Sequence, residues 1–165
     1  MNTLFKHAAA AALALLAASN AWAGAKVTFV HPDQFSDVPF SSSDRDDVLR
    51  ALEQHIDKLA AKLPAGQQLN VEVTDVDLAG QTWPSRFRGQ DIRIMNGRAD
   101  WPHMTLRYTL TQGDQVVRSG DETISDMTYQ MHINRYGRDD PLRYEKRMLD
   151  DWFKDKVATP AMASR

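Results

Sequence analysis

The stretch LNVEVTDVDL, residues Leu69–Leu78, decides the fold class. Its first half alternates apolar with polar side chains, which is typical of a strand that buries one face. The alternation then slips by one position, so Val76 and Leu78 would face away from the core in a regular strand. A β-bulge near Thr74 and Asp75 would return them to the buried face. The stretch therefore predicts a bulged strand in a sheet that is covered on one side.

A helix is predicted before this strand and another near the end of the chain. The first helix begins after Ser43, and its first turn contains acidic residues, which the helix dipole favours at that end. Its apolar stripe ends at Pro64. The second has Asp140 as its N-cap and Pro141 at its first position, where the missing N–H of proline costs nothing. Such stripes are buried against another element, here a sheet. The second stripe consists of Leu142, Met148, Leu149, Trp152 and Phe153.

The remaining strands are predicted from short β-branched runs and turn residues. Ala25–Val30 is a first strand ahead of the first helix. After a loop rich in Gly and Arg at Ala79–Gln90, the dipeptide Asn96-Gly97 predicts a tight hairpin. Its two strands would be Asp91–Met95 and Arg98–Trp101.

A longer hairpin is predicted around Gly113-Asp114. Alternating residues from Met104 lead into this turn, and Gln115–Ile124 returns from it, with a possible bulge at Gly120. Together with the helices, these strands predict an α+β fold. It consists of a mainly antiparallel sheet of about five strands with two helices packed on one face.

Residues 1–23 have the pattern of a cleavable signal peptide. Lys6 precedes the apolar run Ala8–Ala18, and Ala21-Trp22-Ala23 is the small-residue motif that signal peptidase accepts. The run is shorter than the about 20 residues that span a bilayer. The sequence therefore predicts export to the periplasm and a single mature domain over residues 24–165.

The composition excludes several classes of function. The chain has no cysteine, so it has no disulfide, no cysteine-based zinc site, no thiol chemistry and no lipid on a cysteine at the cleavage site. One of its 20 Lys and Arg, and none of its 22 acids, lies in the signal, so the mature chain has a net charge of −3. That charge disfavours nucleic acid and anionic membranes as partners. Phosphate-loop and dinucleotide motifs are absent from the sequence, and no cofactor is predicted.

Five stretches carry a resemblance to a known family. They are VTFVHPDQFSDV at Val27–Val38, LPAGQQLNVEVTDVDLAG at Leu63–Gly80, GRADWPHMTLRYTL at Gly97–Leu110, SGDETISDM at Ser119–Met127 and INRYGRDDPLRYEKRMLDDWF at Ile133–Phe153. Across them the chain is similar to the exported bacterial proteins grouped as domain of unknown function 3016. The resemblance implies an exported protein with one mature domain, and it assigns no catalytic residue.

One candidate site combines Asp75, Asp77 and His103. If the strand continues, the two carboxylates share a face about 6.5–7 Å apart, where they could hold a hard cation or divide acid and base roles. The alternative is a solvated outer face. The histidines of the mature chain show no metal-ligand spacing, so no metal site is predicted, and His55 is expected at the edge of the core beside the first helical stripe.

The second candidate site is the basic and aromatic segment before the last helix. It consists of Arg135, Tyr136, Arg138, Arg143 and Tyr144, supplemented by Arg86 and Arg88 in the loop after the central strand. Arginine with tyrosine suits an anionic or sugar-like ligand, or a protein partner. The alternative is an internal lattice of ion pairs, such as Arg147 with Asp151.

The sequence favours a non-catalytic binding or interaction module of the cell envelope that uses this basic and aromatic segment. Its partner would be an envelope protein or an anionic or sugar-like ligand. The alternative is a small periplasmic hydrolase or metal-dependent enzyme that uses Asp75, Asp77 and His103. The sequence leaves the question of catalysis open.

Overall fold

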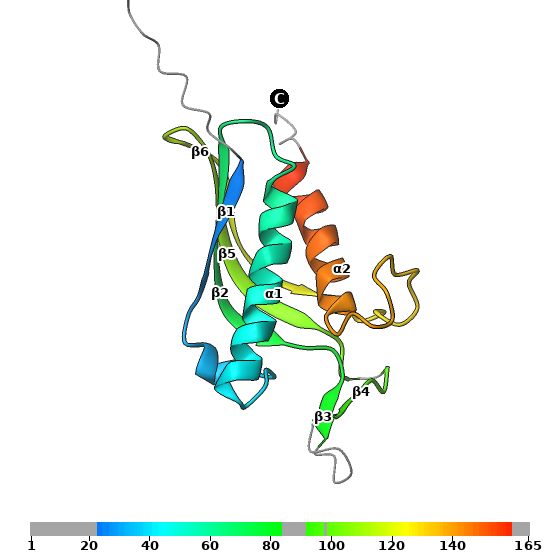
Figure 1. Cartoon of the computed structure of the whole chain (residues 1–165). Helices are drawn as coiled ribbons and strands as arrows, with labels where there is room; N and C mark the ends of the chain where they lie inside the picture. Colours follow the sequence, from blue (N-terminus) through cyan, green and yellow to red (C-terminus); the bar gives the residue numbers. More distant parts are fainter. Residues whose placement is uncertain (1–22, 84–91, 98, 160–165) are drawn as a thin grey trace, which may run out of the picture.

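Two helices lie on one face of a four-stranded sheet in the computed structural model, which describes residues 23–83, 92–97 and 99–159 (Figure 1). The sheet contains β1 (Gly24–Phe29), β2 (Gln67–Asp77), β5 (His103–Gln112) and β6 (Gln115–Ser125). The helices are α1 (Ser42–Ala60) and α2 (Arg143–Trp152), preceded by the 3-10 turn η1 (Pro32–Gln34) and followed by the π-helical turn η2 (Phe153–Ala158). The predicted α+β class, with both helices on one face, is confirmed. The predicted signal peptide lies outside the described residues apart from Ala23.

The sheet order is β1-β2-β5-β6, and it combines parallel with antiparallel pairing. β1 runs parallel to β2, because α1 returns the chain to the end of the sheet from which β1 started. β2, β5 and β6 then pair antiparallel. The prediction of a mainly antiparallel sheet is therefore confirmed, and the parallel edge strand is an addition to it.

The bulge in β2 is confirmed, whereas the bulge expected at Gly120 is wrong. The β2–β5 register shifts between Val73 and Asp75, and Val73 and Val76 are both buried. Gly120 instead pairs regularly with Tyr108. A Cβ at Gly120 would lie 2.9 Å from Cε1 of Tyr108, so this glycine makes room for an aromatic ring.

The predicted hairpin around Asn96-Gly97 is wrong. Gln81–Trp83, expected in a loop, forms β3, and it pairs with β4 (Ile92–Ile94) in a separate ribbon that projects beyond the main sheet (Figure 1). The backbone N–H of Asn96 donates to the carboxylate of Asp100 at 2.6 Å, so a side chain takes the bond that a returning strand would supply.

Both helix starts differ from the prediction by a short distance. α1 begins at Ser42, after Ser41 as its N-cap, and no side chain caps it. α2 begins at Arg143, because Asp140 makes a turn instead of a cap. The Asp140 carboxylate accepts the N–H of Leu142 at 3.0 Å, and its carbonyl accepts the N–H of Arg143 at 3.3 Å.

The core fills the space between the helices and the sheet. Leu52 and Ile56 of α1 belong to the same buried cluster as Val71 and Val73 of β2. The predicted apolar stripe of the last helix is buried throughout, at Leu142, Met148, Leu149, Trp152 and Phe153. Within the described ranges, no helix has the length and apolar character that crossing a bilayer requires.

Candidate functional site

Two adjoining hollows lie between α1 and α2, and together they form what we call the helix groove. Their volumes are about 350 and 570 Å³, and both are lined by Leu59, Lys62 and Arg135. Cations dominate the charged lining, which contains Lys58, Lys62, Arg135, Lys146, Arg147 and Lys154. The carboxylates of the lining are those of Asp140, Asp150 and Asp151. The helix groove is therefore a positive region on a chain with net negative charge.

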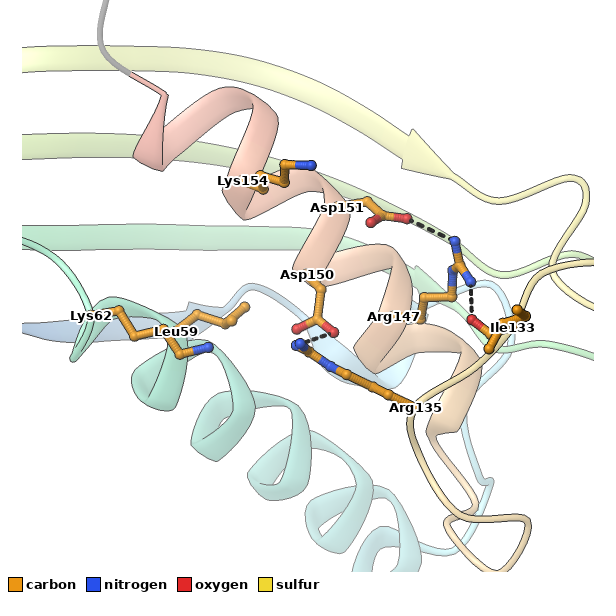
Figure 2. Close-up of a pocket in the computed structure, with 8 residues that line it drawn as sticks. All are labelled: Leu59, Lys62, Ile133, Arg135, Arg147, Asp150, Asp151 and Lys154. Atoms are coloured by element: carbon orange, nitrogen blue, oxygen red, sulfur yellow. Dashed lines mark hydrogen bonds and ion pairs between the residues drawn. The ribbon is translucent and has the colours of Figure 1, made fainter.

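Arg135 lines both hollows. It comes from the loop before α2 and reaches across to Asp150, with its Nη2 2.5 Å from Oδ2 of that residue (Figure 2). The Arg135 side chain is nevertheless 62% exposed. Its guanidinium also donates to the hydroxyl of Tyr136 at 3.2 and 3.3 Å. Arg135 thus keeps donors available to solvent while one ion pair fixes its position.

Asp150 is the centre of the network beneath Arg135. Its Oδ2 accepts the Tyr136 hydroxyl at 2.7 Å, and its Oδ1 lies 3.0 Å from Nε2 of His55. The same Nε2 lies 3.1 Å from the carbonyl of Lys146. Because both neighbours accept only, Nε2 of His55 carries the hydrogen and donates to them. Asp150 therefore receives donors from α1 and from the loop before α2.

Burial sets the protonation of this network. It lowers the pKa of His55, although Asp150 acts in the opposite direction. Burial, followed by the hydrogen bond to Asp150, raises the pKa of Tyr136 to about 12. At neutral pH His55 is neutral and Tyr136 keeps its proton, so the negative charge of Asp150 is balanced by Arg135.

We expect His55 to make the chain less stable as the solution is acidified. Because the pKa of His55 is lowered in the folded state, the unfolded chain takes up the proton first on acidification. The stability that His55 contributes is therefore complete above about pH 6.5 and is lost as the pH falls through the folded pKa. His55→Gln keeps a donor for Asp150 without titrating. Urea denaturation from about pH 8 to pH 5 should show a smaller loss for the variant than for the unchanged chain. Equal losses would contradict a titrating role of His55.

The predicted basic and aromatic segment divides into separate parts. Arg135 and Tyr136 line the helix groove, whereas Arg143 and Tyr144 are not among the residues that line it. The Arg143 guanidinium lies over the Tyr144 ring at 5.3 Å, and that ring packs edge-on against Tyr129 at 4.7 Å.

The other arginines of that candidate site do not line the helix groove in the described part of the chain. They are Arg138, Arg86 and Arg88. Arg138 is exposed and forms no ion pair with any residue that the structure describes. Arg86 and Arg88 lie outside the described residues. One ion pair of the internal lattice, which was the alternative to a binding role, is also present: Arg147 lies 3.6 Å from Asp151.

The acidic candidate site is only partly assembled. Nε2 of His103 lies 3.5 Å from Oδ2 of Asp77, its partner across β2 and β5. Burial raises the pKa of Asp77. Asp75 instead accepts the backbone N–H and the hydroxyl of Ser36, at 2.7 and 2.8 Å. Within residues 23–83, 92–97 and 99–159, no three His, Asp or Glu side chains are grouped as a metal site requires.

Several residues of the helix groove were missed by the sequence analysis. Lys58 lies on the last turn of α1 and Lys62 in the turn that follows it, and no motif in the sequence marks either lysine. Asp150 gave no signal either, because its partner His55 lies 95 positions away.

The comparisons with known proteins support a family and no activity. The sequence model of the family described as Protein of unknown function (DUF3016) matches residues 23–155, which include every residue named in the helix groove. No curated protein and no solved structure matches the chain. The groove is therefore interpreted from its own geometry and charge.

Proposed function

The chain belongs to the family described as Protein of unknown function (DUF3016), and we propose that it is an exported, non-catalytic binding protein. Its ligand in this proposal is anionic and sugar-like in size, and the helix groove holds it around Arg135. The pattern of residues 1–23 supports export to the periplasm. An anionic group displayed by an envelope protein partner has the same chemistry.

The excess of cations in the helix groove carries this proposal. Six Lys and Arg face three Asp there, although acids outnumber Lys and Arg in the chain as a whole. Lys58, Lys62 and Lys154 form no ion pair within the described part of the chain, so their charges are available to a ligand. Clustered charges of one sign raise the local concentration of an oppositely charged ligand.

Arg135 is suited to contact the ligand directly. Its planar donors match carboxylate, phosphate and sulfate groups, and its present partner Asp150 keeps two other donors, His55 and Tyr136. A ligand that takes over Arg135 therefore leaves no bare carboxylate behind. The Asp150 side chain is only 13% exposed, so the ligand has to keep Arg135 close enough to go on compensating that charge.

The size of the helix groove is that of a ligand-binding site. The hollows, at about 350 and 570 Å³, have the size of typical small-molecule sites.

We expect Arg135→Gln to weaken anion binding by about tenfold, because it removes a charge and a donor fork. The probes are inorganic phosphate, citrate and a uronic-acid oligosaccharide, and the measurement is calorimetric titration of the mature chain at low salt. Arg107→Gln is the matched control, because Arg107 is also 62% exposed and paired with an acid, Asp121, but lies outside the helix groove on β5. Equal loss in both variants would contradict a site at the helix groove.

A pull-down from the periplasmic fraction with the mature chain would identify the natural partner. Capture should weaken with Arg135→Gln and with Arg138→Ala, and it should persist with Asp75→Asn and His103→Ala. A metal that binds stoichiometrically and is lost on changing Asp75 or His103 would favour the hydrolase alternative.

A further inference from the structure

The outer edge of β6 offers unpaired backbone groups. Among the described residues β6 pairs only with β5, so it is the last strand on its side of the sheet. The Asp126 N–H donates to the carbonyl of Pro102, the residue opposite, at 3.2 Å. Because antiparallel strands bond through every second residue, the N–H groups of the intervening residues point away from β5. These residues are Ser119, Asp121, Thr123 and Ser125.

A hollow of about 400 Å³ lies beside this edge, between β6 and α2 with its continuation η2. β6 contributes Glu122 and Ile124 to the lining, and the helical side contributes Asp151, Trp152 and Asp155. A strand added to β6 would lie about 4.8 Å from it, and every second side chain of that strand would point toward the helices. Those side chains would enter the hollow.

The hollow is acidic, in contrast to the helix groove. Its lining contains Glu122, Asp126, Asp151 and Asp155, opposed by Lys156, which lies 3.1 Å from Glu122. Arg147 forms ion pairs with Asp126 and Asp151, with nitrogen–oxygen distances of 4.0 and 3.6 Å. Asp155 forms no ion pair with a described residue. A positively charged side chain therefore complements the hollow.

The edge lacks two of the devices that prevent strand addition, proline and lysine. The regular part of β6, RSGDETIS from Arg118 to Ser125, contains neither proline nor lysine. Its Asp121 and Glu122 disfavour a second acidic strand, and a second copy of this chain would bring the same carboxylates to the pairing. The charges thus select against self-association and for a basic strand.

We propose that the β6 edge binds an extended peptide segment of a protein partner as an added strand, with Lys or Arg at alternate positions. Backbone hydrogen bonds to β6 hold the segment, and its basic side chains lie among the carboxylates of the hollow. This site shares Asp151 with the lining of the helix groove but takes a ligand of the opposite charge.

The test uses short capped peptides in which Thr alternates with Lys, or Thr with Glu, and fluorescence anisotropy with the mature chain. The Lys peptide should bind and the Glu peptide should not. Thr123→Pro should weaken binding of the Lys peptide at least about tenfold, because it removes an outward N–H while leaving the bonds to β5 intact. Thr123→Val is the matched control, since it keeps that N–H, and it should bind as the unchanged chain does.

Two further measurements keep the proposal falsifiable if Thr123→Pro fails to fold. A Lys peptide N-methylated at alternate residues should lose binding to the unchanged chain. Asp155→Asn should weaken binding of the Lys peptide without affecting the thermal midpoint. Binding of both peptides alike, or dimerisation of the chain that Thr123→Pro abolishes, would overturn the proposal.

Discussion

Replacing Trp152 by alanine is expected to lower the free energy of unfolding by about 3–5 kcal/mol, as large truncations in a core do. Trp152 is 4% exposed and lies on the last turn of α2, where that helix packs on the sheet. Its ring meets Tyr108 of β5 edge-on, with centroids 5.6 Å apart. Alanine would leave a cavity at this junction. Urea denaturation of a chain of residues 24–165 measures the loss.

Trp83→Ala is the matched control for this prediction. Trp83 lies on β3 and is 54% exposed, so its truncation should change stability by no more than about 0.5 kcal/mol. An unchanged denaturation midpoint for Trp152→Ala would mean that α2 does not depend on this contact. Similar losses in the two variants would mean that exposure does not distinguish the two rings.

Local periodicity was sufficient to predict most of the elements. The alternation in Leu69–Leu78 predicted both β2 and its bulge, because the slip in the pattern is itself the trace of the extra residue. The turn at Gly113 has the positive φ, 58°, that favours glycine, and it joins β5 to β6 as expected. These features depend on neighbours in sequence, which is why sequence alone shows them.

The features that were missed depend on distant partners. Asn96-Gly97 carries a typical hairpin signal, and Gly97 does have positive φ, 67°, yet the neighbouring backbone is bound by the Asp100 side chain. The parallel pairing of β1 with β2 follows from the path of α1, which no local pattern reports. Tertiary contacts override local preference at both places.

In the candidate sites too, the sequence shows features that depend on neighbouring residues and misses those that depend on distant ones. Composition identified the basic and aromatic segment, but only the fold shows that Arg135 and Tyr136 face α1 while Arg143 stacks on Tyr144. His55 was expected at the core edge, and it is buried there. Its bond to Asp150 joins two helices that are far apart in sequence. Such pairs leave no spacing that a motif could report.

Glu145 is the most deeply buried carboxylate among the described residues. It is 1% exposed, on the first turn of α2. Its Oε1 accepts the backbone N–H of Ala79 at 2.7 Å, whereas its Oε2 is buried without a hydrogen-bond partner. Burial raises the pKa of Glu145 above its ordinary 4.5. The charged form of this side chain therefore opposes folding.

Glu145→Gln is expected to stabilise the chain by about 1–3 kcal/mol above neutral pH, because glutamine has a similar shape but carries no charge that burial would penalise. Because the pKa of Glu145 is raised in the folded state, the chain loses stability as the pH rises from 4.5 through that folded pKa. Glutamine does not ionise, so it removes this loss while keeping an acceptor for the N–H of Ala79. The gain should vanish near pH 4, where both states are protonated. Denaturation of both proteins at about pH 4 and pH 8 measures it. A difference that stays constant with pH would show that ionisation of Glu145 is not its cause.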